Sequence, residues 1–144
     1  MACNDISNFG FEGGLEPWYL AAGTVAIVQT GELAYAGEKY LEITTTKSTP
    51  SGTSTQGLYW LDTTKPYTLT VQFNIAVPVS SVNSCTVRAY LGEDPNAEGA
   101  EIASIQPTER NTTINLAAIC SFGGPGAGSQ GVVLFDEVVF GTEC

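Results

Sequence analysis

The stretch YTLTVQFNIAV, residues Tyr67–Val77, alternates apolar and polar side chains and decides the class of fold. Successive side chains of a β-strand point to opposite faces, so such a stretch buries one face and exposes the other. The apolar face carries Leu69, Val71, Phe73, Ile75 and Val77, and the polar face carries Thr68, Thr70, Gln72, Asn74 and Ala76. This pattern predicts a strand that lies on a hydrophobic core.

The segment after a turn at residues 78–83 repeats the pattern. Its apolar face has Cys85, Val87, Ala89 and Leu91, and its polar face has Thr86, Arg88 and Tyr90. The two alternating segments therefore have matching apolar faces. We expect them to be neighbouring strands that pair antiparallel.

Strand signals dominate the rest of the chain, which keeps no helical period for ten residues. Further strands are expected at residues 24–29, 39–45, 55–61, 102–105, 112–120 and 132–140. About nine short strands with this spacing favour a single all-β domain over residues 1–144, a two-sheet antiparallel β-sandwich. The last strand is apolar on successive residues, so it should be central and covered on both sides. Loops are expected at residues 46–54 and 123–131.

Composition and charge exclude several classes of partner. The 144 residues are 43% hydrophobic and only 14% charged, which is typical of a globular protein. Fifteen acidic residues against five basic ones give a net charge of −10, which repels phosphate backbones and anionic lipid headgroups. No apolar run approaches the roughly 20 residues that span a bilayer. Nucleic acid and membrane are therefore not expected as partners.

The four cysteines, Cys3, Cys85, Cys120 and Cys144, indicate disulfides, because the chain has no C-x-x-C pair and no histidine for a zinc or haem site. Three connectivities are possible. We favour Cys3 with Cys144 and Cys85 with Cys120, which places one bridge at the chain ends and the other between two expected strands. Disulfides imply an oxidising compartment and thus a secreted, extracellular protein. The sequon at Asn111 is a candidate N-glycosylation site consistent with secretion.

Several short motifs, in order along the chain, carry a family resemblance. They are the opening Asn8–Glu12 (NFGFE) with Glu16-Pro17-Trp18, then QGL at residues 56–58, SCTV at 84–87 and FDEV at 135–138, with Cys144 closing the chain. In this series the chain resembles the jelly-roll carbohydrate-binding modules of families four, nine and twenty-two, especially secreted fungal forms. The resemblance spans almost the whole length and implies a jelly-roll sandwich. It also implies that Trp18 packs in the core.

The same resemblance implies a structural calcium ion between Glu12 and Asp136. Calcium takes six to eight oxygen ligands, and carboxylates with backbone carbonyls near both chain ends would supply them. The related modules usually have two aspartates in the last strand, whereas this chain has Asp136 followed by Glu137. The alternative is that Glu12 and Asp136 are solvated carboxylates near strand ends.

A carbohydrate site requires aromatic planes for the C–H faces of sugars and hydrogen-bonding groups for their hydroxyls. In the resembled modules the cleft is a concave sheet face. The expected polar face of the two alternating strands supplies amide, guanidinium and phenol groups, and two aromatic residues follow a neighbouring strand; the candidates are Gln72, Asn74, Arg88, Tyr90, Tyr59 and Trp60. The alternative is an ordinary solvated sandwich face. The sequence does not decide whether Tyr35 and Tyr40 lie in the sheet or on the rim of the site.

No feature of the sequence indicates an enzyme. The chain lacks histidine and a Gly-x-Ser-x-Gly elbow, and its adjacent acid pairs would point to opposite faces of a strand. We therefore expect non-catalytic binding of a neutral polysaccharide, a plant cell wall β-glucan or hemicellulose, by a monomeric domain that keeps an attached catalytic domain near its substrate. The alternative is a secreted cell-surface adhesion domain with a protein partner.

Overall fold

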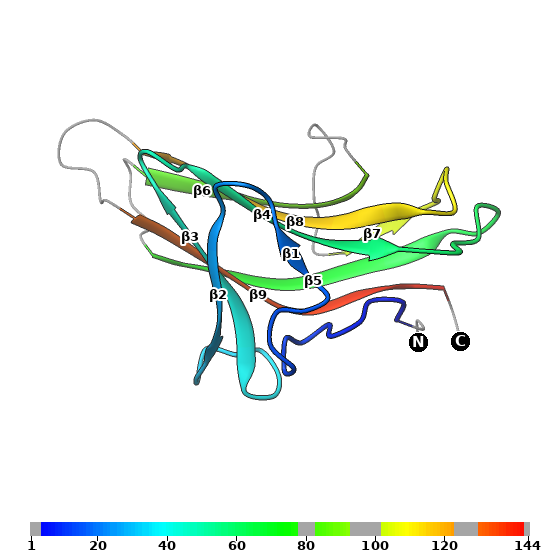
Figure 1. Cartoon of the computed structure of the whole chain (residues 1–144), viewed down its shortest axis with the longest axis horizontal. Helices are drawn as coiled ribbons and strands as arrows, with labels where there is room; N and C mark the ends of the chain where they lie inside the picture. Colours follow the sequence, from blue (N-terminus) through cyan, green and yellow to red (C-terminus); the bar gives the residue numbers. More distant parts are fainter. Residues whose placement is uncertain (1–3, 78–82, 93–101, 123–129, 143–144) are drawn as a thin grey trace.

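Two antiparallel sheets make up the computed structural model, which describes residues 4–77, 83–92, 102–122 and 130–142. The four-stranded sheet has the order β1 (Tyr19–Leu20), β4 (Ser51–Leu58), β8 (Thr112–Phe122), β6 (Asn83–Leu91). The five-stranded sheet has the order β2 (Val25–Thr30), β3 (Lys39–Thr46), β9 (Gln130–Gly141), β5 (Tyr67–Val77), β7 (Ile102–Ile105). Figure 1 shows the two layers, with β4, β6 and β8 above β5 and β9. The expected two-sheet β-sandwich is confirmed.

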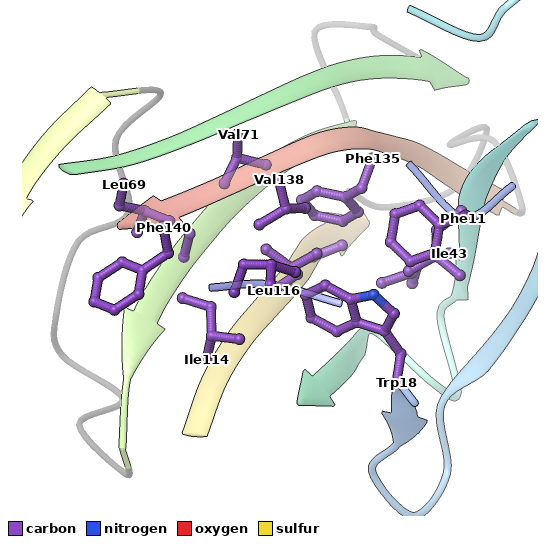
Figure 2. Packing of buried hydrophobic residues seen from close by; sticks show 14 of the residues in the cluster. Phe11, Trp18, Ile43, Leu69, Val71, Ile114, Leu116, Phe135, Val138 and Phe140 are labelled. Atoms are coloured by element: carbon purple, nitrogen blue, oxygen red, sulfur yellow. The ribbon is translucent and has the colours of Figure 1, made fainter. Parts of the chain in front are cut away.

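The core lies between the two sheets, where the apolar side of each alternating strand faces the other sheet. Leu69 of β5, Ile43 of β3 and Phe135 of β9 are fully buried from one sheet, and Ile114 and Leu116 of β8 from the other. Figure 2 shows these side chains meeting in one cluster. The alternation in the sequence of β5 therefore predicts correctly which face of that strand is buried.

The N-terminal segment closes one end of this core. Trp18 is 2% exposed, its ring lies 5.5 Å from that of Phe11, and its indole N–H donates to the carbonyl of Asn8 at 3.1 Å (Figure 2). Asn4 fastens the segment to the end of β9, because its Oδ1 accepts the backbone N–H of Phe140 at 3.0 Å. The expectation that Trp18 packs in the core is confirmed.

The expected pairing of the two best alternating strands is wrong. β5 pairs with β7 and β9, and β6 pairs with β8, so β5 and β6 belong to different sheets. Alternation shows which face of a strand is buried. Two strands show the same pattern when they pair in one sheet and when they face each other across the core, so the pattern does not identify the partner of a strand. Consequently the polar faces of β5 and β6 point away from each other, on opposite sides of the molecule.

β9 is the central strand of the five-stranded sheet, as expected from its consecutive apolar residues. Its outward-facing Leu134 is only 3% exposed, so this part of the strand is covered on both sides. The register with β5 shifts between Thr70 and Gln72, opposite Glu137, whose positive φ of 47° marks a bulge. Beyond the bulge Val138 and Phe140 again face the core.

Two expected segments differ from the structure by three or more residues at a boundary, and the other strand ends differ by at most two. The loop expected at residues 46–54 is only residues 47–50, because β3 extends to Thr46 and β4 begins at Ser51. The strand expected at 55–61 ends at Leu58. The serines, threonines and glycine in this stretch favour turns, but here they form a strand between β1 and β8. Residues 123–129 of the loop expected at 123–131 lie outside the described residues, whereas Gln130 and Gly131 already belong to β9.

One of the two expected disulfides is confirmed. Cys85 and Cys120 are direct cross-strand partners on β6 and β8, with their Cα atoms 4.0 Å apart. The expected bridge between Cys3 and Cys144 lies outside the described residues. Within the described ranges, no helix has the length and apolar character needed to cross a bilayer.

Candidate functional site

A row of four side chains crosses the outer face of the four-stranded sheet. Tyr19 pairs with Thr55, Thr55 with Asn115, and Asn115 with Tyr90, so the row runs over β1, β4, β8 and β6 in turn. Paired residues of antiparallel strands point to the same face, and each strand step is about 4.8 Å. The two tyrosines therefore stand at opposite edges of the sheet, about 14 Å apart along the row.

Small side chains between the tyrosines leave a trough. Its volume is about 370 Å³, and its lining includes Tyr19, Thr53, Thr55, Tyr90, Thr113 and Asn115, which we call the tyrosine trough. Tyr19 is 54% exposed and Tyr90 is half-buried, so both rings can reach a ligand. The floor consists of threonine hydroxyls and the Asn115 amide and carries no charge. The tyrosine rings at the edges of the trough can contact the apolar face of a sugar, and the polar groups on its floor can bond sugar hydroxyls.

Asn115 fixes the floor of the trough. Its Oδ1 accepts the hydroxyl of Thr55 at 2.8 Å, and its Nδ2 donates to the carbonyl of Gly92 at 2.8 Å and to Oγ1 of Thr113 at 3.1 Å. The same Nδ2 lies 3.4 Å from the carbonyl of Tyr90. The amide therefore ties β4, β6 and β8 together, and it holds the backbone that carries the Tyr90 ring.

Three of the side chains expected to bind carbohydrate lie on this face or at its end. Arg88 precedes Tyr90 by two residues on β6 and faces the same side, opposite Ala117. Tyr59 follows β4, and its ring covers Gly57, where an added Cβ would lie only 2.7 Å from the tyrosine Oη. Glycine at this outward position thus leaves room for the Tyr59 ring.

Trp60 lies beyond the end of the sheet. It is 84% exposed, has a positive φ of 59°, and its backbone N–H donates to Oδ1 of Asn111 at 3.2 Å. A hollow of about 250 Å³ beside it is lined by the segment 60–64 and by Arg110. Trp60 therefore stands apart from the trough, past Tyr59.

The expected binding set is not brought together as one strip. Gln72 and Asn74 of β5 lie on the outer face of the five-stranded sheet, on the side of the molecule opposite Arg88 and Tyr90. Sequence reasoning also missed Tyr19, because β1 has only two residues and so shows no alternation. Asn115 was also missed, although the sequence could have indicated it, because Asn115 falls on the polar side of the alternation in β8.

The two carboxylates expected to bind calcium hold the loop between β2 and β3. Asp136 Oδ2 accepts the backbone N–H groups of residues 35 and 36 at 2.9 and 3.2 Å. Glu12 accepts those of residues 38 and 39 at 3.0 and 2.7 Å. Glu12 of the N-terminal segment and Asp136 of β9 therefore hold the same hairpin loop, which projects from the lower side of the molecule (Figure 1).

Negative charge accumulates around these carboxylates. Burial raises the pKa of Asp136, and the charge of Glu12 adds to the effect. Burial also raises the pKa of Glu137, with further contributions from the charges of Asp136 and Glu12. Both side chains lie near Gly10, where a Cβ would be 3.3 Å from Glu137 Oε1 and 3.6 Å from Asp136 Oδ1. In the part of the chain that the structure describes, no three His, Cys, Asp or Glu side chains are arranged to hold a metal ion, so a cation here would need backbone carbonyls as well.

Comparison with solved structures identifies the architecture. A xylan-binding domain from carbohydrate-binding module family 22 matches over 97% of this chain and 96% of its own length, with a TM-score of 0.52 and 11% identity. A structure described as explaining the promiscuous specificity of carbohydrate-binding modules from the β-sandwich superfamily matches with a TM-score of 0.54 and 15% identity. The chain has the jelly-roll fold of carbohydrate-binding modules. At these identities the likeness concerns the fold alone.

A third neighbour is the enzymatically active domain of tailspike protein 4 from bacteriophage CBA120, with a TM-score of 0.60 and 10% identity. The match covers 96% of this chain but only 21% of the tailspike chain, and it covers 63% of the promiscuous module's chain. No family model and no curated protein matches the sequence.

Proposed function

We propose that this carbohydrate-binding-module-like domain binds a neutral polysaccharide in the tyrosine trough and does so without catalysis. The observation that carries the proposal is the cross-sheet row in which Tyr19 and Tyr90 flank Thr55 and Asn115. A trough flanked by two aromatic rings suits a polymer, because each ring can pack against a different sugar unit of one chain.

The chemistry of the trough fits a sugar chain. The C–H face of a sugar ring packs against a tyrosine ring, while hydroxyls at the ring edge need donors and acceptors. Thr53 and Thr113 supply hydroxyls along the floor, and Arg88 supplies a guanidinium group on the β6 side. Tyr59 would extend the contact beyond the trough, where its ring lies over Gly57.

Charge favours a neutral polymer. A net charge of −10 opposes the approach of polyanions, whereas an uncharged polysaccharide pays no such cost. Among neutral polymers we propose a plant cell wall β-glucan or hemicellulose; one structural neighbour is described as a xylan-binding domain.

In its biological setting, we propose that the domain is secreted and monomeric and is joined to a catalytic domain. The Cys85–Cys120 disulfide suits an oxidising compartment. Holding an attached enzyme on its polymer raises the effective concentration of substrate without any new catalytic group.

We further propose a calcium ion between Glu12 and Asp136. The mutual repulsion of these carboxylates and Glu137 is the supporting observation, because a divalent cation would offset it. Backbone carbonyls near Gly10 would complete the ligand set that calcium requires. The ion would strengthen the grip on the β2–β3 loop, and it would lie away from the tyrosine trough.

Affinity electrophoresis tests the proposed function. Native gels containing hydroxyethylcellulose, xylan, glucomannan or xyloglucan should retard the wild-type protein in at least one case, and Tyr90→Ala should abolish most of that retardation. Thr86→Ala is the matched control, because Thr86 is exposed on the same face of β6 but lies opposite Ile119, away from the trough. Retardation in none of the gels would contradict the proposal and favour a protein partner. Equal retardation of wild type and Tyr90→Ala would move binding away from the trough.

A further inference from the structure

A second hollow lies on the opposite side of the molecule, on the outer face of the five-stranded sheet. It has a volume of about 210 Å³ and is lined by side chains from the β2–β3 loop and from β3, β5 and β9, among them Leu33, Tyr35, Tyr40, Gln72, Asn74 and Leu134. We call it the hairpin pocket. It shares no residue with the tyrosine trough.

The sheet supplies the floor and one wall of the hairpin pocket. Ile27, Glu42, Leu134 and Asn74 form a cross-strand row over β2, β3, β9 and β5. Leu134 faces outward, lines the pocket and is only 3% exposed, so it lies at the bottom of the pocket as an apolar floor. Gln72 lies two residues before Asn74 on the same face, so the two amides are about 7 Å apart along one edge of the pocket.

The β2–β3 loop supplies the opposite wall. Tyr35 is 67% exposed, and its backbone is held by the hydrogen bond from its N–H to Asp136 Oδ2 at 2.9 Å. A buried carboxylate that accepts two loop N–H groups holds the loop strongly, because loss of these hydrogen bonds would leave the desolvation penalty of the carboxylate uncompensated. The Tyr35 ring is thus presented to solvent from a fixed backbone position beside the amides.

The two amides have unused hydrogen-bonding capacity. Across the described residues, the side chains of Gln72 and Asn74 make no hydrogen bond, although Gln72 is half-buried. The amide of Asn115 in the trough, by contrast, is occupied on both its oxygen and its nitrogen. An amide can donate to one hydroxyl and accept from its neighbour, so a pair of them matches the vicinal hydroxyls of a sugar.

From these features we propose that the hairpin pocket is a second carbohydrate site, which takes a single neutral sugar unit such as a chain end or a side branch. This inference rests on the proposed function for the class of ligand. The sugar hydroxyls bond Gln72 and Asn74, and its C–H face lies against the exposed ring of Tyr35. The volume is below the roughly 300 to 1,000 Å³ of pockets that enclose drug-sized ligands, so it limits the ligand to about one ring. The negative charge of Glu42, opposite Leu134 on the same face of the sheet, disfavours uronic acids.

A second site at this place has a consequence for how the domain works. The trough and the hairpin pocket lie on the outer faces of two sheets stacked about 10 Å apart and point in opposite directions. One stretch of polymer cannot occupy both. A domain with two such sites bridges two polymer chains, with one chain in the trough and an end or a side branch of the other in the hairpin pocket.

Nuclear magnetic resonance on the whole domain tests the second site. The probes are the methyl glycosides of glucose, xylose, mannose and galactose at millimolar concentrations. At least one should give saturable shifts of the side-chain amide signals of both Gln72 and Asn74, and Asn74→Ala should remove the response at Gln72. Asn74 is exposed, so this variant should fold. No response of either amide to any of the four glycosides overturns the inference.

A variant of the trough distinguishes failure of the second site from failure of the proposed function. The double variant Tyr19→Ala/Tyr90→Ala should lose retardation in polysaccharide gels but keep the shifts at Gln72 and Asn74. If the shifts disappear in that folded variant, they report binding in the trough, and the second site is refuted. If the gels show no retardation while both amides still respond, the trough proposal fails and the hairpin pocket stands.

Discussion

The hydroxyl of Thr55 donates a 2.8 Å hydrogen bond to Oδ1 of Asn115, and both groups are buried on the floor of the tyrosine trough. Replacing Asn115 by alanine would leave this hydroxyl and the carbonyl of Gly92 without their partner. We expect Asn115→Ala to lower the free energy of unfolding by about 1 to 3 kcal/mol, measured by urea denaturation. Asn74→Ala is the control, because that exposed amide has no such network, and it should change stability by less than about 0.5 kcal/mol. Equal stability of the two variants would show that the network does not hold the floor.

The two tryptophans should respond in opposite ways to truncation. Trp18 is buried against Phe11, so Trp18→Ala should cost about 3 to 5 kcal/mol of unfolding free energy. Trp60 is 84% exposed, and Trp60→Ala should leave stability within about 0.5 kcal/mol of wild type. Thermal or chemical denaturation distinguishes the two. If Trp18→Ala unfolds normally but loses polysaccharide binding, Trp18 has been placed on the wrong side of the fold.

The Cys85–Cys120 bridge should contribute strongly to stability. It closes a loop of 35 residues, and the chain-entropy model gives about 4 kcal/mol for a loop of this size, as an upper figure. The double variant Cys85→Ser/Cys120→Ser should therefore have a clearly lower urea midpoint. Dithiothreitol reduces any disulfide in the protein. The urea midpoint of the wild type should therefore fall at least as far with dithiothreitol as the midpoint of the double variant falls without it. An unchanged midpoint in the double variant would contradict the expectation.

Calcium should raise the melting temperature, and a chelator should lower it. The effect should disappear in Asp136→Asn, which removes one of the charges that burial and Glu12 make costly. Glu109→Gln removes a carboxylate that is exposed and distant in sequence from this region, so it should keep the full calcium response. Magnesium should act more weakly, because it gives up its bound waters reluctantly. Identical melting curves with calcium and with chelator would exclude the ion.

Period-two alternation was enough to predict the sandwich, because it is a local property of each strand. Val71 and Leu69 face the core as the sequence of β5 requires. The partner of a strand is not local, and the two segments with the clearest alternation, β5 and β6, lie in opposite sheets. The inferred strip of Gln72, Asn74 and Tyr90 was wrong for that reason alone, although the outward direction of each strand's polar face was correct.

The trough itself could be predicted only in part. Tyr90 was found because it sits in a long alternating strand, whereas Tyr19 occupies a two-residue strand that leaves no periodic signal. The serine, threonine and glycine neighbours of Thr53 predict a loop, since these residues favour turns when nothing else constrains them. Pairing with β8 overrides that local preference. Tertiary contacts of this kind cannot be obtained from one segment of sequence.

Calorimetric titration of the polysaccharide that retards the protein most strongly tests the role of the two trough tyrosines directly. If Tyr19 and Tyr90 form the main binding surface, the folded double variant Tyr19→Ala/Tyr90→Ala should lose about 2 kcal/mol or more of binding free energy, which is about a thirty-fold fall in affinity. An affinity equal to that of wild type, in a double variant shown to be folded, would mean that the polysaccharide binds elsewhere on the domain.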